Sequence, residues 1–148
     1  MMTDMDRFKE CLDKLDPDSI VCVASTSSCF APRTCDDLVG IAKECQTRNI
    51  PHVCNNAYGL QSTRCCHLIN EAIRVGRLDA FVQSTDKNFQ VPVGGAVVSS
   101  SSRSFVEEVG KSYISLSISI LDFEKVNLLK PTTLPHTDTR DELPCHHF

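Results

Sequence analysis

Lys87 is the residue of this sequence with the clearest capacity for covalent chemistry. It follows an apolar stretch, is flanked by Asp86 and Asn88, and precedes the pair Gly94-Gly95. A lysine at the mouth of an α/β crevice can form a Schiff base with a carbonyl compound, because its long side chain ends in a primary amine. When position is the only guide, a solvated lysine in a turn is the simpler interpretation.

The cysteines and histidines give little sign of a metal site. The sequence has nine cysteines but no Cys-x-x-Cys pair, and Cys65-Cys66 are adjacent, which suits neither a zinc knuckle nor an ordinary disulfide. Cys145-His146-His147 resembles a ligand cluster, but three consecutive residues rarely surround a tetrahedral ion. We therefore predict no metal and interpret the cysteines as reduced thiols of a cytosolic protein.

Hydrophobic periodicity predicts the elements that must position Lys87. Apolar residues spaced three to four apart predict helices over 4–15, 34–49, 62–75 and 104–113. Short apolar runs predict strands over 20–24, 51–54, 78–82 and 96–98. Thr34 with Asp37 has the pattern of a capping box, and Gly76 has that of a helix stop.

This alternation of strands and helices predicts the fold class. Short connections over residues 20–113 imply right-handed crossovers and an α/β fold, with a mainly parallel sheet and helices on both faces. In such sheets, function lies at the carboxyl ends of the strands. Two polar segments fall there, Asn55 to Gly59 and Ser84 to Asn88.

Charge and hydropathy exclude some classes of protein. The 15 Lys and Arg against 19 Asp and Glu give a net charge of −4, which excludes a generally basic nucleic-acid coat but not a local basic patch. No apolar run approaches the ~18–20 residues of a membrane-spanning helix, and the charged N-terminus has no signal-peptide core. We expect a cytoplasmic protein without membrane association.

An ordered series of uncommon motifs resembles one known family. The series comprises Thr26 to Arg33, Asn55 to Ser62, Arg74 to Asn88 and Val91 to Ala96, in the family's order and spacing. Over about residues 5–113 it is similar to O-phosphoseryl-tRNA(Sec) selenium transferase, the archaeal and eukaryotic selenocysteine synthase.

The resemblance implies part of the large domain of a type I pyridoxal-phosphate-dependent transferase. The family reaction exchanges the phosphate of phosphoseryl-tRNA(Sec) for selenium from selenophosphate, and the family enzymes are homo-oligomers (tetramers). By the motif match, Lys87 is the catalytic lysine that forms a Schiff base with pyridoxal 5'-phosphate and then removes the α-proton of the substrate.

The match also implies two further cofactor contacts. Asn55 is carried over as an amide that hydrogen-bonds the pyridine ring, with Asn56 as the alternative if the strand phase differs by one. Ser84 is carried over as a contact of the cofactor phosphate, although a hydroxyl that caps the loop explains it equally well. Because one ring must touch both Asn55 and Lys87, we expect these residues to approach each other across one crevice.

Arg74 matches a family arginine that contacts tRNA. A sequence-independent contact with phosphate is the role this implies. Arg64, His67 and Arg74 share one helical stripe. Bare charge stripes are usually solvated faces, and pairing with Glu71 is the simple alternative for Arg74.

The sequence departs from the family at both ends. It lacks the family's N-terminal part, which supplies the phosphate-binding loop, and it has Ile114-Ser115-Leu116 where the family continues with Pro-Gly-Arg. We expect a partial large domain over 1–113, an unrelated, irregular or disordered tail over 114–148, and an inactive fragment. A non-catalytic α/β remnant and another pyridoxal-phosphate enzyme acting on sulfur or selenium amino acids stay open as alternatives.

Overall fold

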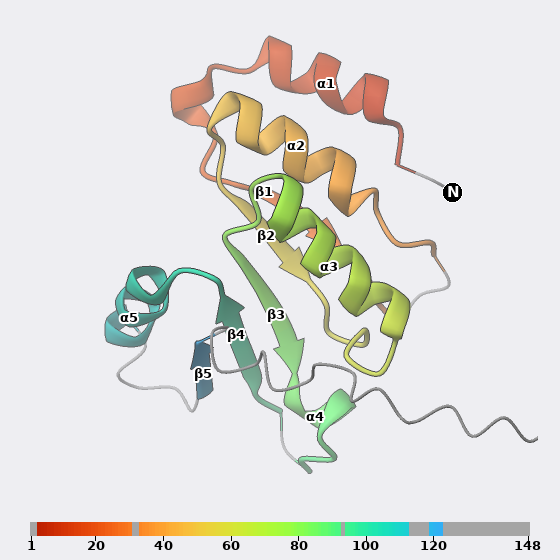
Figure 1. Ribbon diagram of the computed structural model, residues 1–148, viewed down its shortest axis with the longest axis vertical. Coiled ribbons are helices and arrows are strands. Elements are labelled where there is room, and N and C mark those ends of the chain that lie inside the picture. Colours follow the sequence, from red (N-terminus) through yellow and green to blue (C-terminus); the bar gives the residue numbers. More distant parts are fainter. Residues whose placement is uncertain (1–2, 31–32, 93, 113–118, 123–148) are drawn as a thin grey trace, which may run out of the picture.

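The computed structural model describes residues 3–30, 33–92 and 94–112 and the backbone of 119–122 (Figure 1). Its elements in chain order are α1 (Met5–Lys14), a 3-10 helix η1 (Pro17–Ser19), β1 (Val23–Thr26), α2 (Leu38–Arg48), β2 (His52–Asn55), α3 (Thr63–Val75), β3 (Ala80–Ser84), α4 (Thr85–Asn88), β4 (Ala96–Ser100), α5 (Arg103–Ser112) and β5 (Ser119–Asp122). Residues 113–118, the tail beyond 122 and the Cys145-His146-His147 cluster lie outside the described residues.

The strands form one five-stranded sheet in the order β1-β2-β3-β4-β5. Strands β1, β2 and β3 are parallel, β4 is antiparallel to β3, and β5 is parallel to β4. The mainly parallel sheet is confirmed. The reversal at β4 was not predicted. It follows from the connection 85–95, whose only helix is the four-residue α4, because an antiparallel return needs no crossover helix.

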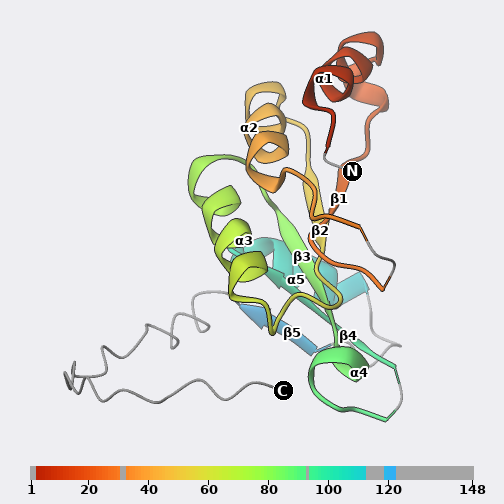
Figure 2. The same cartoon turned by 90° about the vertical axis from the view of Figure 1, so that its right-hand side faces the viewer.

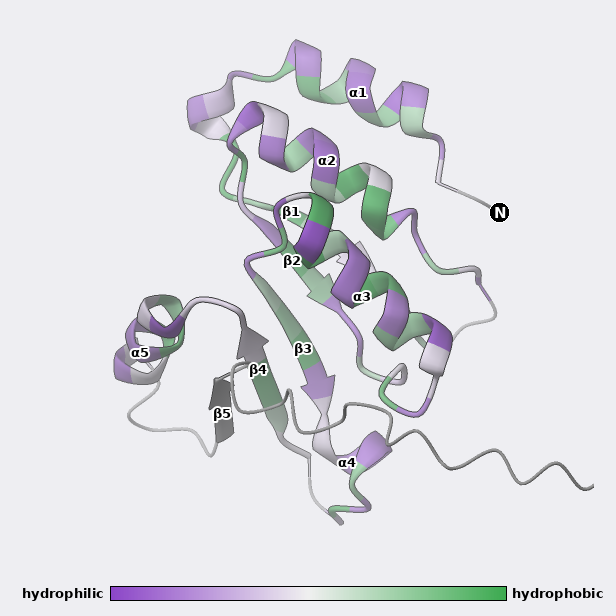
Figure 3. Cartoon of the chain, viewed as in Figure 1, coloured by the Kyte–Doolittle hydropathy of each residue, from purple (hydrophilic) through white to green (hydrophobic). Residues whose placement is uncertain are grey.

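Helices α2 and α3 cover one face of the sheet and build the core with it (Figures 1 and 2). The buried cluster between these layers consists of Leu38, Ala42, Cys54, Ile69, Ala72, Leu78 and Phe81. Helix α5 packs against β4 and β5 (Figure 1). The expectation of helices on both faces stays a prediction. In Figure 3 the hydrophobic colour concentrates on the central strands and the helix sides toward them.

Helix α1 forms an outer layer on α2. Among the described residues of α1, Leu12 alone is buried, and ion pairs make much of the remaining contact between α1 and α2. Lys9 Nζ lies 3.2 Å from Glu44 Oε1, and Arg48 Nη1 lies 2.6 Å from Asp13 Oδ1. Such partly exposed pairs stabilise only weakly, so α1 is attached less firmly than α2 or α3.

Local hydrogen bonds explain where the crossover helices begin and end. The N-cap of α2 is Asp37, whose Oδ1 accepts from the Gly40 amide at 2.9 Å, so the capping box expected from Thr34 is replaced by this simpler cap. Helix α2 ends at Asn49, which adopts the left-handed conformation at φ 55°. Ser62 caps α3, and Gly76 ends it as predicted.

Strand β1 begins three residues later than its apolar run. Pairing starts at Val23, whose amide donates to the Pro51 carbonyl at 2.8 Å. Val21 precedes that pairing and is 87 % exposed. The predicted start of this strand was therefore wrong: β1 is the edge strand of the sheet, and three of the five residues of the apolar run precede it.

Candidate active site

The segments expected to carry function meet at one edge of the sheet. Strand β2 ends at Asn55 and β3 ends at Ser84, and these neighbouring strands are parallel, with Asn55 opposite Val82. Lys87 lies in α4, which begins at the residue after β3 (Figure 1). Asn55 and Lys87 therefore follow neighbouring strands at the same edge of the sheet, and their approach across one crevice stays a prediction.

A surface hollow of about 440 Å³ opens at this edge, on the sheet face away from α2 and α3. Asn55 and Ser84 both line it, whereas Lys87 does not. Its lining residues are Ala24, Ser25, Thr26, Val53, Asn55, Ala57, Val82, Gln83, Ser84, Gly95 and Ala96. None of these carries a charge, so the hollow offers amide, hydroxyl and apolar groups but no cation.

The two asparagines after β2 have opposite environments. Asn55 is exposed, and its Oδ1 accepts from the Ala57 amide at 3.0 Å, which leaves its Nδ2 for a ligand. Asn56 is fully buried, and its Oδ1 accepts from the Ser27 hydroxyl. A ligand in the hollow can therefore reach Asn55 but not Asn56.

Lys87 is held from two directions. Its Nζ lies 4.7 Å from the centroid of the Tyr58 ring, a cation–π distance. The next residue, Asn88, donates from Nδ2 to the carbonyls of Ala57 and Ser84, at 2.7 Å each. Asn88 thus ties α4 to the turn after β2, and Tyr58 on that turn meets the lysine.

Ser84 already has a partner within its own loop. Its hydroxyl donates to Asp86 Oδ1, and this bond is the main reason that the pKa of the Asp86 carboxyl is lowered. This is the loop contact expected as the alternative to a ligand contact. The hydroxyl oxygen can still accept a hydrogen bond from a group in the hollow.

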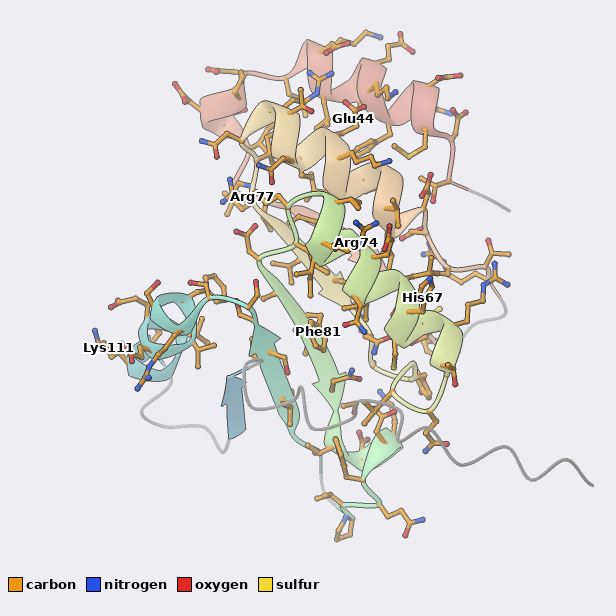
Figure 4. All side chains as sticks on the ribbon, viewed as in Figure 1. Glu44, His67, Arg74, Arg77, Phe81 and Lys111 are labelled. Atoms are coloured by element: carbon orange, nitrogen blue, oxygen red, sulfur yellow. The ribbon has the colours of Figure 1, made fainter. Side chains whose placement is uncertain are left out.

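Arg74 lies away from this edge, near the C-terminal end of α3 (Figure 4). Its Nε donates to Glu71 Oε2 at 3.0 Å, and its Nη2 also donates to Glu71. The pair raises the pKa of Arg74 and lowers that of Glu71. The Arg74 side chain remains 70 % exposed, so it can exchange this partner for another anion.

His52 is a buried polar residue that sequence reasoning did not single out. It is 0 % exposed; its Nδ1 lies 2.9 Å from the Arg77 carbonyl and its Nε2 lies 2.7 Å from Ser25 Oγ. The carbonyl can only accept, so Nδ1 carries the proton and Nε2 accepts from the Ser25 hydroxyl. Burial lowers the pKa of the ring, which makes His52 a neutral structural link between β1 and β2.

The fold class of the chain is confirmed by a solved structure. The crystal structure of an archaeal O-phosphoseryl-tRNA(Sec) selenium transferase superposes with a TM-score of 0.60 at 34 % identity, over 74 % of this chain and 24 % of that one. This fold is the α/β large domain of type I pyridoxal-phosphate-dependent transferases.

The particular family follows from sequence comparison. A family model described as O-phosphoseryl-tRNA(Sec) selenium transferase matches residues 1–130, past the boundary expected near 113. Proteins of that name are similar to this chain: the one from Dictyostelium discoideum is 47 % identical over 111 residues, and the one from Caenorhabditis elegans 42 % over 113. These matches cover 75 % and 76 % of this chain. The chain belongs to the O-phosphoseryl-tRNA(Sec) selenium transferase family.

The match covers only part of each relative. The matched part of the chain spans 23 % of the length of both the Dictyostelium discoideum and the Caenorhabditis elegans protein. None of the described helices is both long and apolar enough to cross a membrane.

Proposed function

We propose that this chain carries the lysine-bearing part of an O-phosphoseryl-tRNA(Sec) selenium transferase. The observation that carries the proposal is the placement of Lys87 in α4, directly after β3 and beside the end of β2, within the stretch that matches the family. We assign residues 1–113 to the family's partial large domain, and the family match continues to residue 130.

The donor groups at the edge fit pyridoxal 5'-phosphate in part. Lys87 offers a primary amine, Asn55 a free amide nitrogen for the pyridine ring, and Ser84 a hydroxyl for the phosphate. When bound, the cofactor withdraws electrons from the α-carbon of the amino acid. Lys87 would hold the cofactor, and its Nζ would then take the α-proton while the substrate phosphate leaves.

Covalent labelling tests the role of Lys87. The full 148-residue chain is incubated with pyridoxal phosphate, reduced with borohydride and digested, and the modified peptides are measured by mass spectrometry. We expect the label at Lys87 at low cofactor concentration, loss of that label in Lys87→Arg, and no change in Lys111→Arg, whose lysine pairs with Glu108 at 2.6 Å on α5. Labelling spread evenly over the lysines contradicts the proposal and favours a non-catalytic α/β remnant.

The family name supports a phosphoseryl-tRNA(Sec) substrate for the whole enzyme. We propose phosphoseryl-tRNA(Sec) as acceptor, selenophosphate as selenium donor, and a homotetramer as the assembled enzyme. Arg74, exposed on α3 with Arg64 and His67 on the same helix, is the proposed contact of a tRNA phosphate. The reducing cytoplasm is the proposed compartment, which suits the buried thiols of Cys45 and Cys54.

A further inference from the structure

Two buried amides lie just beneath the candidate active site. Asn56 is 0 % exposed and Gln83 is 4 % exposed. Asn56 Nδ2, a donor, and Gln83 Oε1, an acceptor, each lack a hydrogen-bond partner among the residues that the structure describes. Buried polar atoms are nearly always paired, so two complementary orphans in one region require an explanation.

The sheet register brings these two amides together. Asn55 is opposite Val82, and the Asn56 amide extends that ladder by donating to the Val82 carbonyl at 2.9 Å. The next positions along the two strands are Asn56 and Gln83. Side chains alternate along a strand, and Cys54 and Phe81, two residues earlier, belong to the core under α2 and α3. Asn56 and Gln83 are therefore cross-strand neighbours on the same buried face.

The two amides are not paired with each other in this structure. We propose that Asn56 and Gln83 act as a coupled pair of positioning residues, in which a side-chain rotation brings the Asn56 amide to the Gln83 carbonyl and so fixes the two segments that hold Lys87. The proposal rests on the proposed function only for the role of Lys87. The coupling itself is a property of the fold and is measured without any cofactor.

Hydrogen bonds and packing join this pair to the lysine. Asn56 is fixed by the Ser27 hydroxyl and by Gly59, where a Cβ would come within 1.9 Å of Asn56 Oδ1. Ala57 follows Asn56, and its carbonyl accepts from Asn88 Nδ2. Ser84 follows Gln83, and its carbonyl accepts from the same nitrogen. Movement of either strand end would shift Asn88 and therefore Lys87 beside it.

The sharpest test is Gln83→Met, which keeps the length of the side chain and removes its polar atoms. If Gln83 Oε1 were an isolated orphan, the apolar replacement would leave stability unchanged or raise it. If Gln83 Oε1 accepts from Asn56 Nδ2, Gln83→Met leaves that buried nitrogen without an acceptor. We expect the urea midpoint of the full chain to fall. An unchanged or higher midpoint overturns the proposal.

A double-mutant cycle tests the pairing itself. Asn56→Asp keeps the oxygen that accepts from Ser27 and replaces the Nδ2 donor. We expect the Asn56→Asp and Gln83→Met losses to be non-additive, with the double variant less destabilised than the two losses combined. Additive losses contradict the coupling. If Asn56→Asp does not fold, the result for Gln83→Met decides.

A second readout separates positioning from general stability. Ile50→Val removes one methylene at the amino end of β2, where Ile50 is 4 % exposed, and serves as the destabilised control. We expect hydrogen exchange of residues 84–89 and 56–60 to quicken several-fold in Gln83→Met but not in Ile50→Val. If both variants quicken exchange equally at these segments, the pair has no positioning role.

Discussion

Single residues of this chain do their work through neighbours that are remote in sequence. His52 depends on a hydroxyl from β1 and a carbonyl from the segment before β3. Its amide also donates to Asp79 Oδ2 at 2.8 Å. An imidazole bound at both ring nitrogens and closed to water is stable in its neutral form only, because a charged ring would lose its acceptor role toward Ser25.

We predict that His52 makes stability fall at mildly acidic pH. Its pKa in the folded chain lies below the ordinary value of 6.5, so the unfolded chain binds the proton more readily. The contribution is fully present above about pH 6.5 and is lost as pH falls through the folded pKa. Urea midpoints measured from pH 8 to pH 5 should show this decline. His52→Gln should flatten it, whereas exposed His67→Gln should not.

We predict that Glu71 limits the affinity of Arg74 for RNA. A phosphate must compete with a two-bond ion pair, and exposed pairs of this kind stabilise only weakly. Glu71→Gln should therefore tighten tRNA binding by up to about fivefold in a filter or fluorescence assay at fixed salt. Glu107→Gln, which breaks the exposed Arg103–Glu107 pair on α5, is the matched control. Equal effects of both variants would leave only net charge as the cause.

At the scale of elements, the contact between α2 and α3 depends on a glycine. Gly76 follows α3, and a Cβ there would lie 2.4 Å from the Ala42 backbone carbon. The backbone of a buried helix cannot move aside cheaply, so Gly76→Ala should lower the free energy of unfolding by about 1–3 kcal/mol. Gly94→Ala, with nothing within 4 Å of its Cβ, should change it by no more than about 0.5 kcal/mol. Thermal denaturation of the two variants provides the comparison, and equal losses would refute the packing argument.

Elements whose burial follows one periodicity could be predicted from sequence. Helix α3 lies within one residue of its expected start because Ser62 caps it and Ile69 and Ala72 keep the apolar spacing. The start of β1 could not be read in this way, because an apolar run does not reveal which of its residues find a partner strand. The reversal at β4 had a signal, since no helical pattern separates residues 82 and 96.

The candidate site was predictable only where one motif spans it. Lys87, Asn55 and Ser84 lie in continuous motifs, so the edge that they share follows from the order of the strands. Their roles stay predictions. The contact between Tyr58 and Lys87 could not be predicted, because a tyrosine in a turn gives no hint of a partner about thirty residues away.

For the whole molecule, the decisive property is a hollow with polar groups but no cation. The cofactor and the proposed substrate each carry a phosphate, and a phosphate without a cationic partner binds poorly in a closed site. We predict that residues 1–148 alone do not form selenocysteinyl-tRNA from phosphoseryl-tRNA and selenophosphate with added pyridoxal phosphate. Turnover that disappears in Lys87→Ala would show that this chain is a sufficient enzyme.

The return of β4 along β3 has a mechanical consequence for the loop that carries the lysine. Ser84 pairs with Ala96, and the Thr85 amide donates to the Gly95 carbonyl at 3.1 Å. Residues 85–95 therefore form a loop whose two ends are fixed to the sheet. Residues can be inserted in the middle of such a loop without moving its paired ends. A reporter peptide inserted after the exposed Gln90, near the middle of residues 85–95, would leave the paired strands in place, which makes this loop a site for attaching a probe.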